Sequence, residues 1–273
     1  SLCFILYILT YAYISGGGSI VAHTIKSIFD FDAPIILSGM LFSLSLALCV
    51  WYGTALVGRL STVLVAGMLI SFLLSIHGFV LHVEIRTLFN SKAEYAIYIL
   101  AAVPYFMTSF GYHGCVPSLI KYYSSNVRMV KGCLLFGSLL ALSFYLIWLA
   151  ATLGNIPREE FANISTSGGN IGDLVNALRS KTDATFLSNT LAIFANMAVV
   201  SSFLGVTLGL FDFIADKFKF LDNSFGRLKA AVVTFLPPTL AGIFFPNGFL
   251  HAIGLAGMFA CIFGSIVPAL AAK

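Results

Sequence analysis

The sequence predicts an all-α integral membrane protein with about eight transmembrane helices. Of its 273 residues, 59% are apolar and 10% are charged, whereas an average soluble domain has about 45–50% apolar and about 25% charged residues. A water-soluble chain of this length does not hide so many apolar side chains from solvent. The apolar runs are also long and continuous, and they suffice for roughly eight stretches of about 20 residues, the length that crosses a bilayer as helix.

Eight candidate spans follow from these runs. They cover roughly residues 2–25, 35–57, 61–81, 96–123, 131–153, 187–215, 228–245 and 248–271. Helix is expected in each span because lipid offers no partner to backbone N–H and C=O groups. The fourth and the sixth spans are long enough to tilt or to be broken.

Lysine and arginine residues predict the orientation of the spans. If the first span starts on the cytoplasmic side, nine of these residues fall in cytoplasmic segments, three in short external loops and three in the one long external loop. Basic residues are enriched on the cytoplasmic side, and long loops count little. We therefore expect both ends of the chain in the cytoplasm, and the net charge of +4 gives no reason to expect a nucleic-acid partner.

The long external loop, predicted at residues 154–186, is the main polar segment of the sequence. Pro157 followed by two glutamates predicts the start of a helix, since acidic residues favour the positive end of the helix dipole. The pattern from Asp173 to Arg179 predicts a second, amphipathic helix. Two short helices here form either an external lid or a passive connector.

No enzyme is predicted, because the sequence contains no motif for a catalytic serine, a metalloprotease or a phosphate-binding loop. The five cysteines are scattered through apolar runs without the spacing of metal ligands. We therefore expect no catalytic residues, no metal site and no cofactor.

The fourth span contains the sequence TSFGYHGCVP, from Thr108 to Pro117. Two glycines three residues apart, a histidine and a proline make a poor continuous helix. One interpretation is a discontinuous helix near residues 109–114, whose unwound turn exposes backbone groups that are tolerated only beside a cavity or other protein. Half-helix ends of this kind attract zwitterions and coupling cations. The alternative is a glycine-packed helix crossing with a proline kink.

A few polar side chains in other spans are further candidates. Tyr13, near the middle of the first span, either lines a pocket or bonds to a neighbouring helix. Ser201 and Ser202 either bind a cation or substrate, or bond back to their own helix. Asp212 is either part of a proton relay or a structural group near the span end. His113 either titrates near neutral pH or forms hydrogen bonds as a neutral ring.

Four blocks of residues make the sequence similar to the bacterial aromatic amino acid permeases, the tyrosine-specific and tryptophan permeases of the hydroxy and aromatic amino acid permease family. The blocks are residues 13–16 (YISG), 108–114 with 116–118 (TSFGYHG and VPS), 202–212 (SFLGVTLGLFD) and 234–238 (TFLPP). They resemble the family in order and spacing, and the similarity extends over nearly the whole chain. The tyrosine branch looks most similar.

The resemblance implies a partial five-plus-five inverted repeat of the amino acid–polyamine–organocation type in a single transmembrane transporter domain, residues 1–273. In that fold, residues 1–85 are the remainder of the first repeat and residues 95–273 are the second repeat. The chain then corresponds to spans three to ten of eleven, a fragment without the first two spans and the last. The fourth span becomes the family's broken sixth helix.

The resemblance also implies a substrate site between the broken helices and the family's third and eighth spans. By position, the predicted substrate contacts are Tyr13, Thr108, Ser109, Phe110, Gly111, Tyr112 and Ser202. The candidates for proton or ion coupling are His113, Ser201 and Asp212.

The function implied by the resemblance is secondary active transport of an aromatic amino acid, with tyrosine as the predicted substrate, across the bacterial inner membrane by proton symport. The expected partners are the amino acid, protons and the lipid bilayer, and the proton gradient is the energy source. Some proton-coupled relatives carry a lysine in the fifth helix, and the corresponding span here, residues 61–81, has none. The alternative is a truncated, non-transporting remnant or partner subunit of such a permease.

Overall fold

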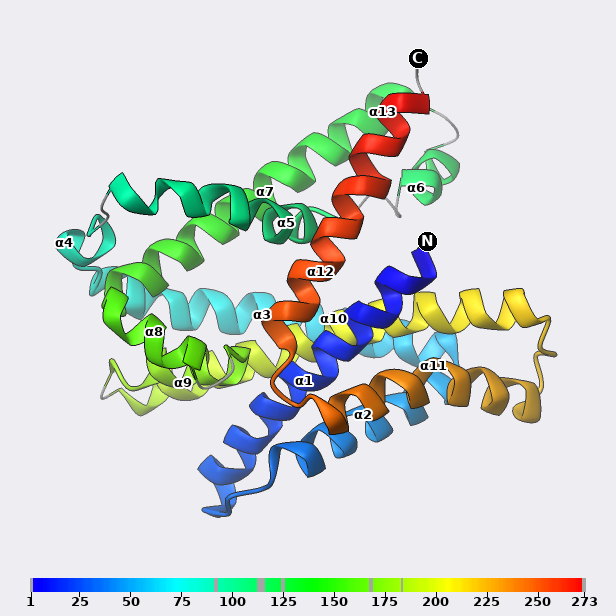
Figure 1. Cartoon of the computed structure of the whole chain (residues 1–273), viewed down its shortest axis with the longest axis horizontal. Coiled ribbons are helices and arrows are strands. Elements are labelled where there is room, and N and C mark those ends of the chain that lie inside the picture. Colours follow the sequence, from blue (N-terminus) through cyan, green and yellow to red (C-terminus); the bar gives the residue numbers. More distant parts are fainter. Residues whose placement is uncertain are drawn as a thin grey trace. The chain divides into compact units, whose positions relative to one another are not determined.

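The computed structural model describes residues 2–90, 93–111, 116–123, 126–166, 169–182 and 184–271. Every regular element in these ranges is a helix (Figure 1). Six of the helices in the described ranges are long and apolar enough to cross a membrane. They are α1 (Leu2–Phe29), α2 (Ile35–Tyr52), α3 (Thr54–Leu81), α7 (Val127–Asn155), α10 (Thr185–Phe218) and α11 (Ser224–Phe244). The predicted all-α integral membrane fold is confirmed.

Shorter apolar helices occupy the two other predicted spans. The fourth predicted span contains α5 (Tyr98–Ser109), which follows the 3₁₀ helix η1 (Ala93–Ile97), and α6 (Val116–Tyr122). The eighth contains α12 (Phe249–Cys261), the π-helical turn η3 (Ile262–Ile266) and α13 (Val267–Ala271). The remaining short helices are α4 (Ile85–Leu88), α8 (Arg158–Thr166) and α9 (Ile171–Arg179).

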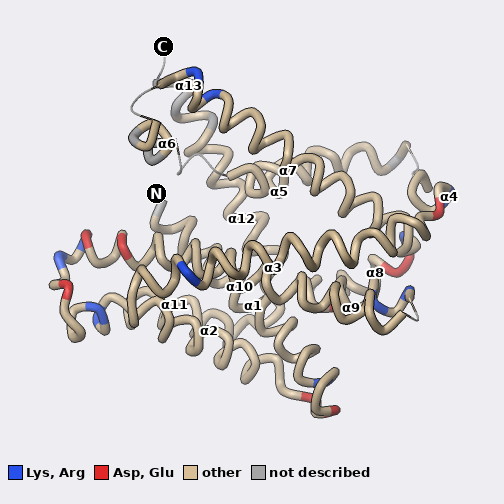
Figure 2. Tube along the Cα trace, turned by 180° about the vertical axis from the view of Figure 1, so that it is seen from behind, with Lys and Arg blue, Asp and Glu red and all other residues tan. Residues whose placement is uncertain are grey.

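Charged residues are concentrated at helix ends and in connecting segments, as Figure 2 shows. The segment between α10 and α11 and the starts of α4 and α8 carry such residues. Long apolar helices with charges at their ends are what a bilayer requires, because a charged side chain at the bilayer centre is costly.

The joint between α2 and α3 lies at Gly53, so the predicted gap between residues 57 and 61 was wrong. Gly53 has an extended backbone, with φ 161° and ψ 153°, which ends α2. Arg227, at the start of α11, donates from Nε to the carbonyl of Trp51 and from Nη2 to the carbonyl of Val50, both at 2.9 Å. A cation at a helix C-terminus satisfies its last carbonyls and interacts well with the dipole. This long-range cap is absent from the local sequence pattern.

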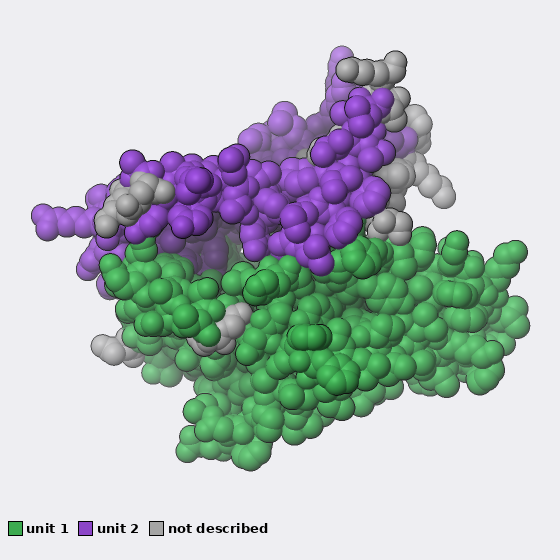
Figure 3. Space-filling model, viewed as in Figure 1, with its two compact units in different colours: residues 1–78, 156–253 green, residues 79–155, 254–273 purple. Residues whose placement is uncertain are grey.

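The chain divides into two compact units (Figure 3). Unit 1 contains residues 1–78 and 156–253, and unit 2 contains residues 79–155 and 254–273. The division into residues 1–85 and 95–273 is a grouping by repeat, and it stays a prediction.

In unit 1, α1 packs against α2, α9, α10 and α11. The backbones of α1 and α2 touch at Gly18, where an added Cβ would lie 2.9 Å from the Cα of Gly39. The core of the unit is aromatic: the fully buried Phe203 of α10 meets Phe42 with ring centroids 5.0 Å apart and Phe235 at 6.0 Å. Small residues at a helix crossing allow this close contact in a membrane protein.

Candidate functional site

The predicted interruption of the fourth span is confirmed at Phe110 and Gly111. Helix α5 ends at Ser109, Phe110 has φ −105° and ψ 21°, and α6 begins at Val116. At these two described residues the chain is not helical, so the alternative of a glycine-packed helix crossing with a proline kink, continuous through them, is wrong. The predicted site residues Tyr112 and His113 lie outside the described residues.

The two hydroxyl groups in the last turn of α5 donate hydrogen bonds to backbone carbonyls of the same helix. The Oγ1 of Thr108 donates to the carbonyl of Pro104 and the Oγ of Ser109 donates to the carbonyl of Tyr105, both at 2.9 Å. The N–H of Gly111 donates to the carbonyl of Thr108 at 3.1 Å, a tight bond of the kind that closes helix ends. Both hydroxyls and the N–H of Gly111 are thus already bonded within the end of α5.

Within unit 2, α12 supports this turn through a glycine. A Cβ added at Gly257 would overlap the carbonyl oxygen of Pro104, and it would lie 2.7 Å from the Oγ1 of Thr108. Only glycine permits such an approach of two helix backbones. The position of the interruption is therefore set by packing as well as by its own sequence.

Tyr145 of α7 contacts the end of α5, and the sequence reasoning missed it. Its hydroxyl donates to the carbonyl of Ser109 at 2.8 Å. Its ring meets the ring of Phe110 edge to face, with centroids 5.3 Å apart and an interplanar angle of 83°. The local sequence carries no signal for this contact, because residues 109 and 145 meet only through the packing of α5 and α7.

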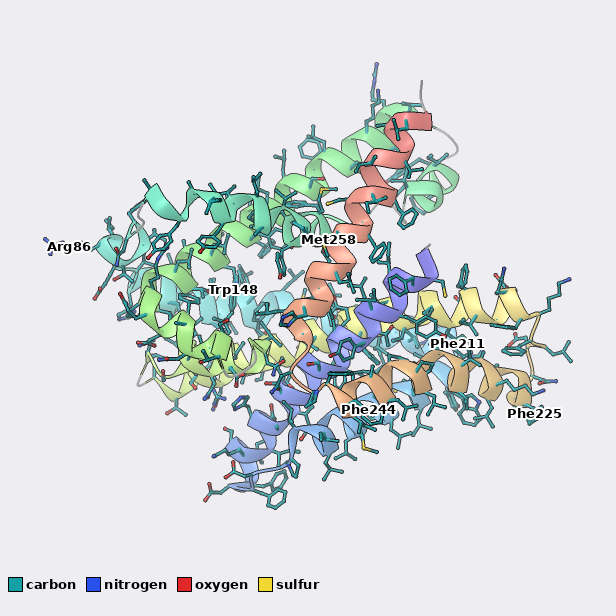
Figure 4. The ribbon with its side chains drawn as sticks, in the orientation of Figure 1. Arg86, Trp148, Phe211, Phe225, Phe244 and Met258 are labelled. Carbon is teal, nitrogen blue, oxygen red and sulfur yellow. The ribbon has the colours of Figure 1, made fainter. Side chains whose placement is uncertain are left out.

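The other predicted site residues lie on α1 and α10. Tyr13 is partly buried on α1, and Ser202 is exposed on α10. The Oγ of Ser201 donates to the carbonyl of Ala198 at 3.1 Å, so this serine bonds back to its own helix. Asp212 is exposed and follows Phe211, whose ring lies under the guanidinium of Arg227 at 5.2 Å (Figure 4 labels Phe211).

The predicted substrate contacts consequently fall in both compact units. Tyr13 and Ser202 belong to unit 1, and the described residues of the interruption belong to unit 2. Their assembly into one site stays a prediction.

A polar stripe along α1 was also missed. It consists of every fourth residue of the helix: Tyr7, Tyr11, Ser15, Ser19, His23 and Ser27. Residues four apart lie on one face of a helix. Successive members lie about 40° apart around a helix of 3.6 residues per turn, so the stripe, which was visible in the sequence, winds around α1 and its two halves meet different helices.

The first half of the stripe bonds to backbone carbonyls. Tyr7 donates to the carbonyl of Val233 at 2.8 Å and Tyr11 to that of Phe245 at 2.7 Å. Pro237 lies inside α11, and a proline offers no N–H to the carbonyl four residues earlier. That carbonyl belongs to Val233, so the hydroxyl of Tyr7 replaces the missing helical donor.

The second half of the stripe faces α9. Nε2 of His23 lies 3.0 Å from Oδ1 of Asp173. The buried side chain of Asn170, just before α9, accepts a hydrogen bond from Ser15 at 3.3 Å and donates one to Asn247 at 3.0 Å. The two short helices predicted in the loop are confirmed, and α9 buries Leu178 against the unit.

A hollow lies between α1, α9 and α10, with about 240 Å³ of empty space, part of it open to the exterior. Its polar lining consists of His23, Thr24, Asn176, Arg179 and Asn196. The Nδ2 of Asn196 donates to the Oγ1 of Thr24 at 3.1 Å, and Nε of Arg179 donates to Ser188 at 2.8 Å. The hollow therefore combines these polar groups with the apolar side chains of Ile20, Val175, Ala192 and Ala195.

Comparison with known proteins places the chain in a family. The model of the tryptophan/tyrosine permease family matches residues 1–273. A tryptophan-specific transport protein of Pseudomonas aeruginosa is 51% identical over the whole chain, and one of Shigella flexneri is 49% identical. A tyrosine permease of Enterobacter agglomerans is 41% identical over 99% of the chain and 67% of its own length.

The chain spans 66% of the length of the two tryptophan-specific relatives. No solved structure matches it. The match to the family model covers the residues of all four sequence blocks. The chain belongs to the tryptophan/tyrosine permease family.

Proposed function

We propose that the complete protein containing this chain carries an aromatic amino acid, tryptophan or tyrosine, across the bacterial inner membrane. The observation that carries the proposal is the interruption between α5 and α6 in a chain of this family. The names of the relatives support tryptophan and tyrosine alike.

The chemistry of the interruption suits a zwitterion with an aromatic ring. The last carbonyls of a helix form the negative end of its dipole, and a carbonyl oxygen that accepts one hydrogen bond keeps a second lone pair, so the end of α5 attracts an ammonium group. The ring of Phe110 adjoins that end and offers a face or edge to an aromatic side chain. Tyr13, Ser202 and Tyr112 are proposed to complete the site.

Proton symport is the proposed source of energy. His113 and Asp212 are the proposed coupling groups, since protonation changes the charge of both side chains. Placing an ionisable side chain within a membrane span costs free energy, so such residues are commonly functional. Ser201 is the weaker candidate, because its hydroxyl already bonds to its own helix.

The segment with α8 and α9 is proposed to be an external lid, with both ends of the chain in the cytoplasm. Its contacts support a lid better than a passive connector: α9 packs on α1 and α10, and Asp173 pairs with His23.

Uptake into proteoliposomes tests the proposal. The complete protein is expected to accumulate labelled tryptophan or tyrosine when the lumen is more alkaline than the medium, and to stop when an uncoupler removes the gradient. Accumulation of the amino acid to the same level with and without the proton gradient would contradict symport. No uptake of either amino acid would contradict the transport proposal and favour a remnant or partner subunit.

A further inference from the structure

The contact between α7 and the end of α5 involves two adjacent residues of the interruption and one tyrosine. The carbonyl of Ser109 accepts from the hydroxyl of Tyr145 at 2.8 Å, and the next residue, Phe110, meets the ring of the same tyrosine. A single side chain therefore holds both a backbone carbonyl and an aromatic ring.

The carbonyl of Ser109 needs such a donor. Helix α5 ends at Ser109, and among the described residues the hydroxyl of Tyr145 donates to this carbonyl. A carbonyl without a partner is costly in an environment that lacks water. The bond from Tyr145 removes this cost and fixes the direction of the carbonyl.

A second contact of α7 extends the same pattern. The Sγ of Cys133 donates to the hydroxyl oxygen of Tyr123, just after α6, at 3.2 Å. Cys133 and Tyr145 are twelve positions apart on α7, a rise of about 18 Å. Their partners, Tyr123 and Ser109, are fourteen positions apart in the segment that contains the interruption. Helix α7 thus contacts the chain on both sides of the interruption, at the end of α5 and just after α6.

We propose that Tyr145 is a positioning residue for substrate binding: it holds the carbonyl of Ser109 and the ring of Phe110 in the orientation that receives the amino acid. The inference rests on the proposed function and assigns a role to a residue outside the four sequence blocks. Tyr145 acts through Ser109 and Phe110, so its removal lowers affinity for the amino acid without removing a substrate contact.

Two substitutions separate the two contacts of Tyr145. Tyr145→Phe keeps the ring pair and loses the hydrogen bond, and Tyr145→Leu loses both. Tyr52→Phe is the matched control, because Tyr52 is 77% exposed at the end of α2 and, among the described residues, its hydroxyl has no hydrogen-bond partner. All variants are made in the complete protein, and their amounts in the membrane are compared.

Transport kinetics measure affinity. Tyr145→Phe is expected to raise KM about three- to tenfold with little change in maximal rate per folded molecule, the usual effect of one hydrogen bond. Tyr145→Leu raises it about a further two- to tenfold through loss of the aromatic pair. A fall in folded protein with unchanged KM would show a merely structural role and overturn the inference.

Hydrogen exchange tests positioning without relying on transport. The amides of Phe110 and Gly111, which bond to the carbonyls of Phe106 and Thr108, are expected to exchange faster in Tyr145→Phe and at the wild-type rate in Tyr52→Phe. Unchanged exchange would overturn the inference. If the wild-type protein takes up neither amino acid, the proposed function fails, and exchange still decides whether Tyr145 holds the end of α5.

Discussion

At the scale of single residues, the spans place donors where the backbone lacks them. The hydroxyl of Tyr7 donates a hydrogen bond to the carbonyl of Val233, for which Pro237 offers no N–H. The hydroxyl of Tyr145 donates to the carbonyl of Ser109, where α5 ends. Arg227 does the same at the end of α2. Because lipid offers no hydrogen bonds, the side-chain donor at each of these three helix irregularities comes from another helix.

This rule predicts the stability of variants at Tyr7. Tyr7→Phe is expected to destabilise the protein by about 1–3 kcal/mol, since it leaves the carbonyl of Val233 without a donor. Adding Pro237→Ala restores a backbone N–H at position 237, so the cost of Tyr7→Phe should be smaller in that background. Unfolding in detergent gives the four free energies of the double-mutant cycle. Equal costs in both backgrounds would contradict the pairing.

The residues of the candidate site were predictable only in part. Thr108, Ser109, Phe110 and Gly111 were identified because glycine and proline disfavour a continuous helix there, and the helix does end at that place. Tyr145 was not identified, because a tyrosine inside an apolar span looks the same whether it faces lipid or caps another helix. The carbonyl to which its hydroxyl donates lies 36 positions away in the chain.

At the scale of elements, the apolar runs predicted where helices occur better than where they end. All eight predicted spans contain helix. The boundary between α2 and α3 was wrong, since it depends on Gly53 and on the distant Arg227. The loop between α7 and α10 was predicted to contain two short helices, and the amphipathic pattern that begins at Asp173 correctly indicated the one that packs on α1.

The attachment of α9 to α1 depends on a small residue at position 172. A Cβ on Gly172 would overlap the Oγ of Ser19 and lie 2.8 Å from Cδ2 of His23. Gly172→Val is therefore expected to loosen α9 and to raise hydrogen exchange about tenfold or more across Ile171–Arg179, with little change in α7.

Gly58→Val is the matched control for this prediction, because a Cβ there meets nothing within 4 Å. It should leave exchange in α9 unchanged. Equal exchange in α9 for Gly172→Val and the wild-type protein would show that α9 does not depend on this contact.

At the scale of the whole molecule, composition alone predicted a membrane protein, and the six long apolar helices among the described residues agree. The inverted repeat came from the resemblance and stays a prediction, as does the joining of residues from both units into one site. Composition and periodicity describe individual helices, and they carry no information on which helices share a binding site. Membership of the permease family supplies the function class.

The central claim is that an aromatic amino acid binds at the interruption that follows α5. A cysteine at Ser109 in an otherwise cysteine-free complete protein is the direct probe, because Ser109 is exposed and the change is small. Ser143→Cys on α7 is the matched control, since that serine is also exposed and also bonds to its own helix, at 2.9 Å from the carbonyl of Leu139.

The measurement is the rate at which a membrane-permeant maleimide labels each cysteine. Tryptophan or tyrosine at saturating concentration is expected to slow labelling at position 109 about fivefold or more, as mass action on a blocked site requires, while alanine does not and position 143 is unaffected. Equal labelling rates at position 109 with and without the aromatic amino acids would contradict the account.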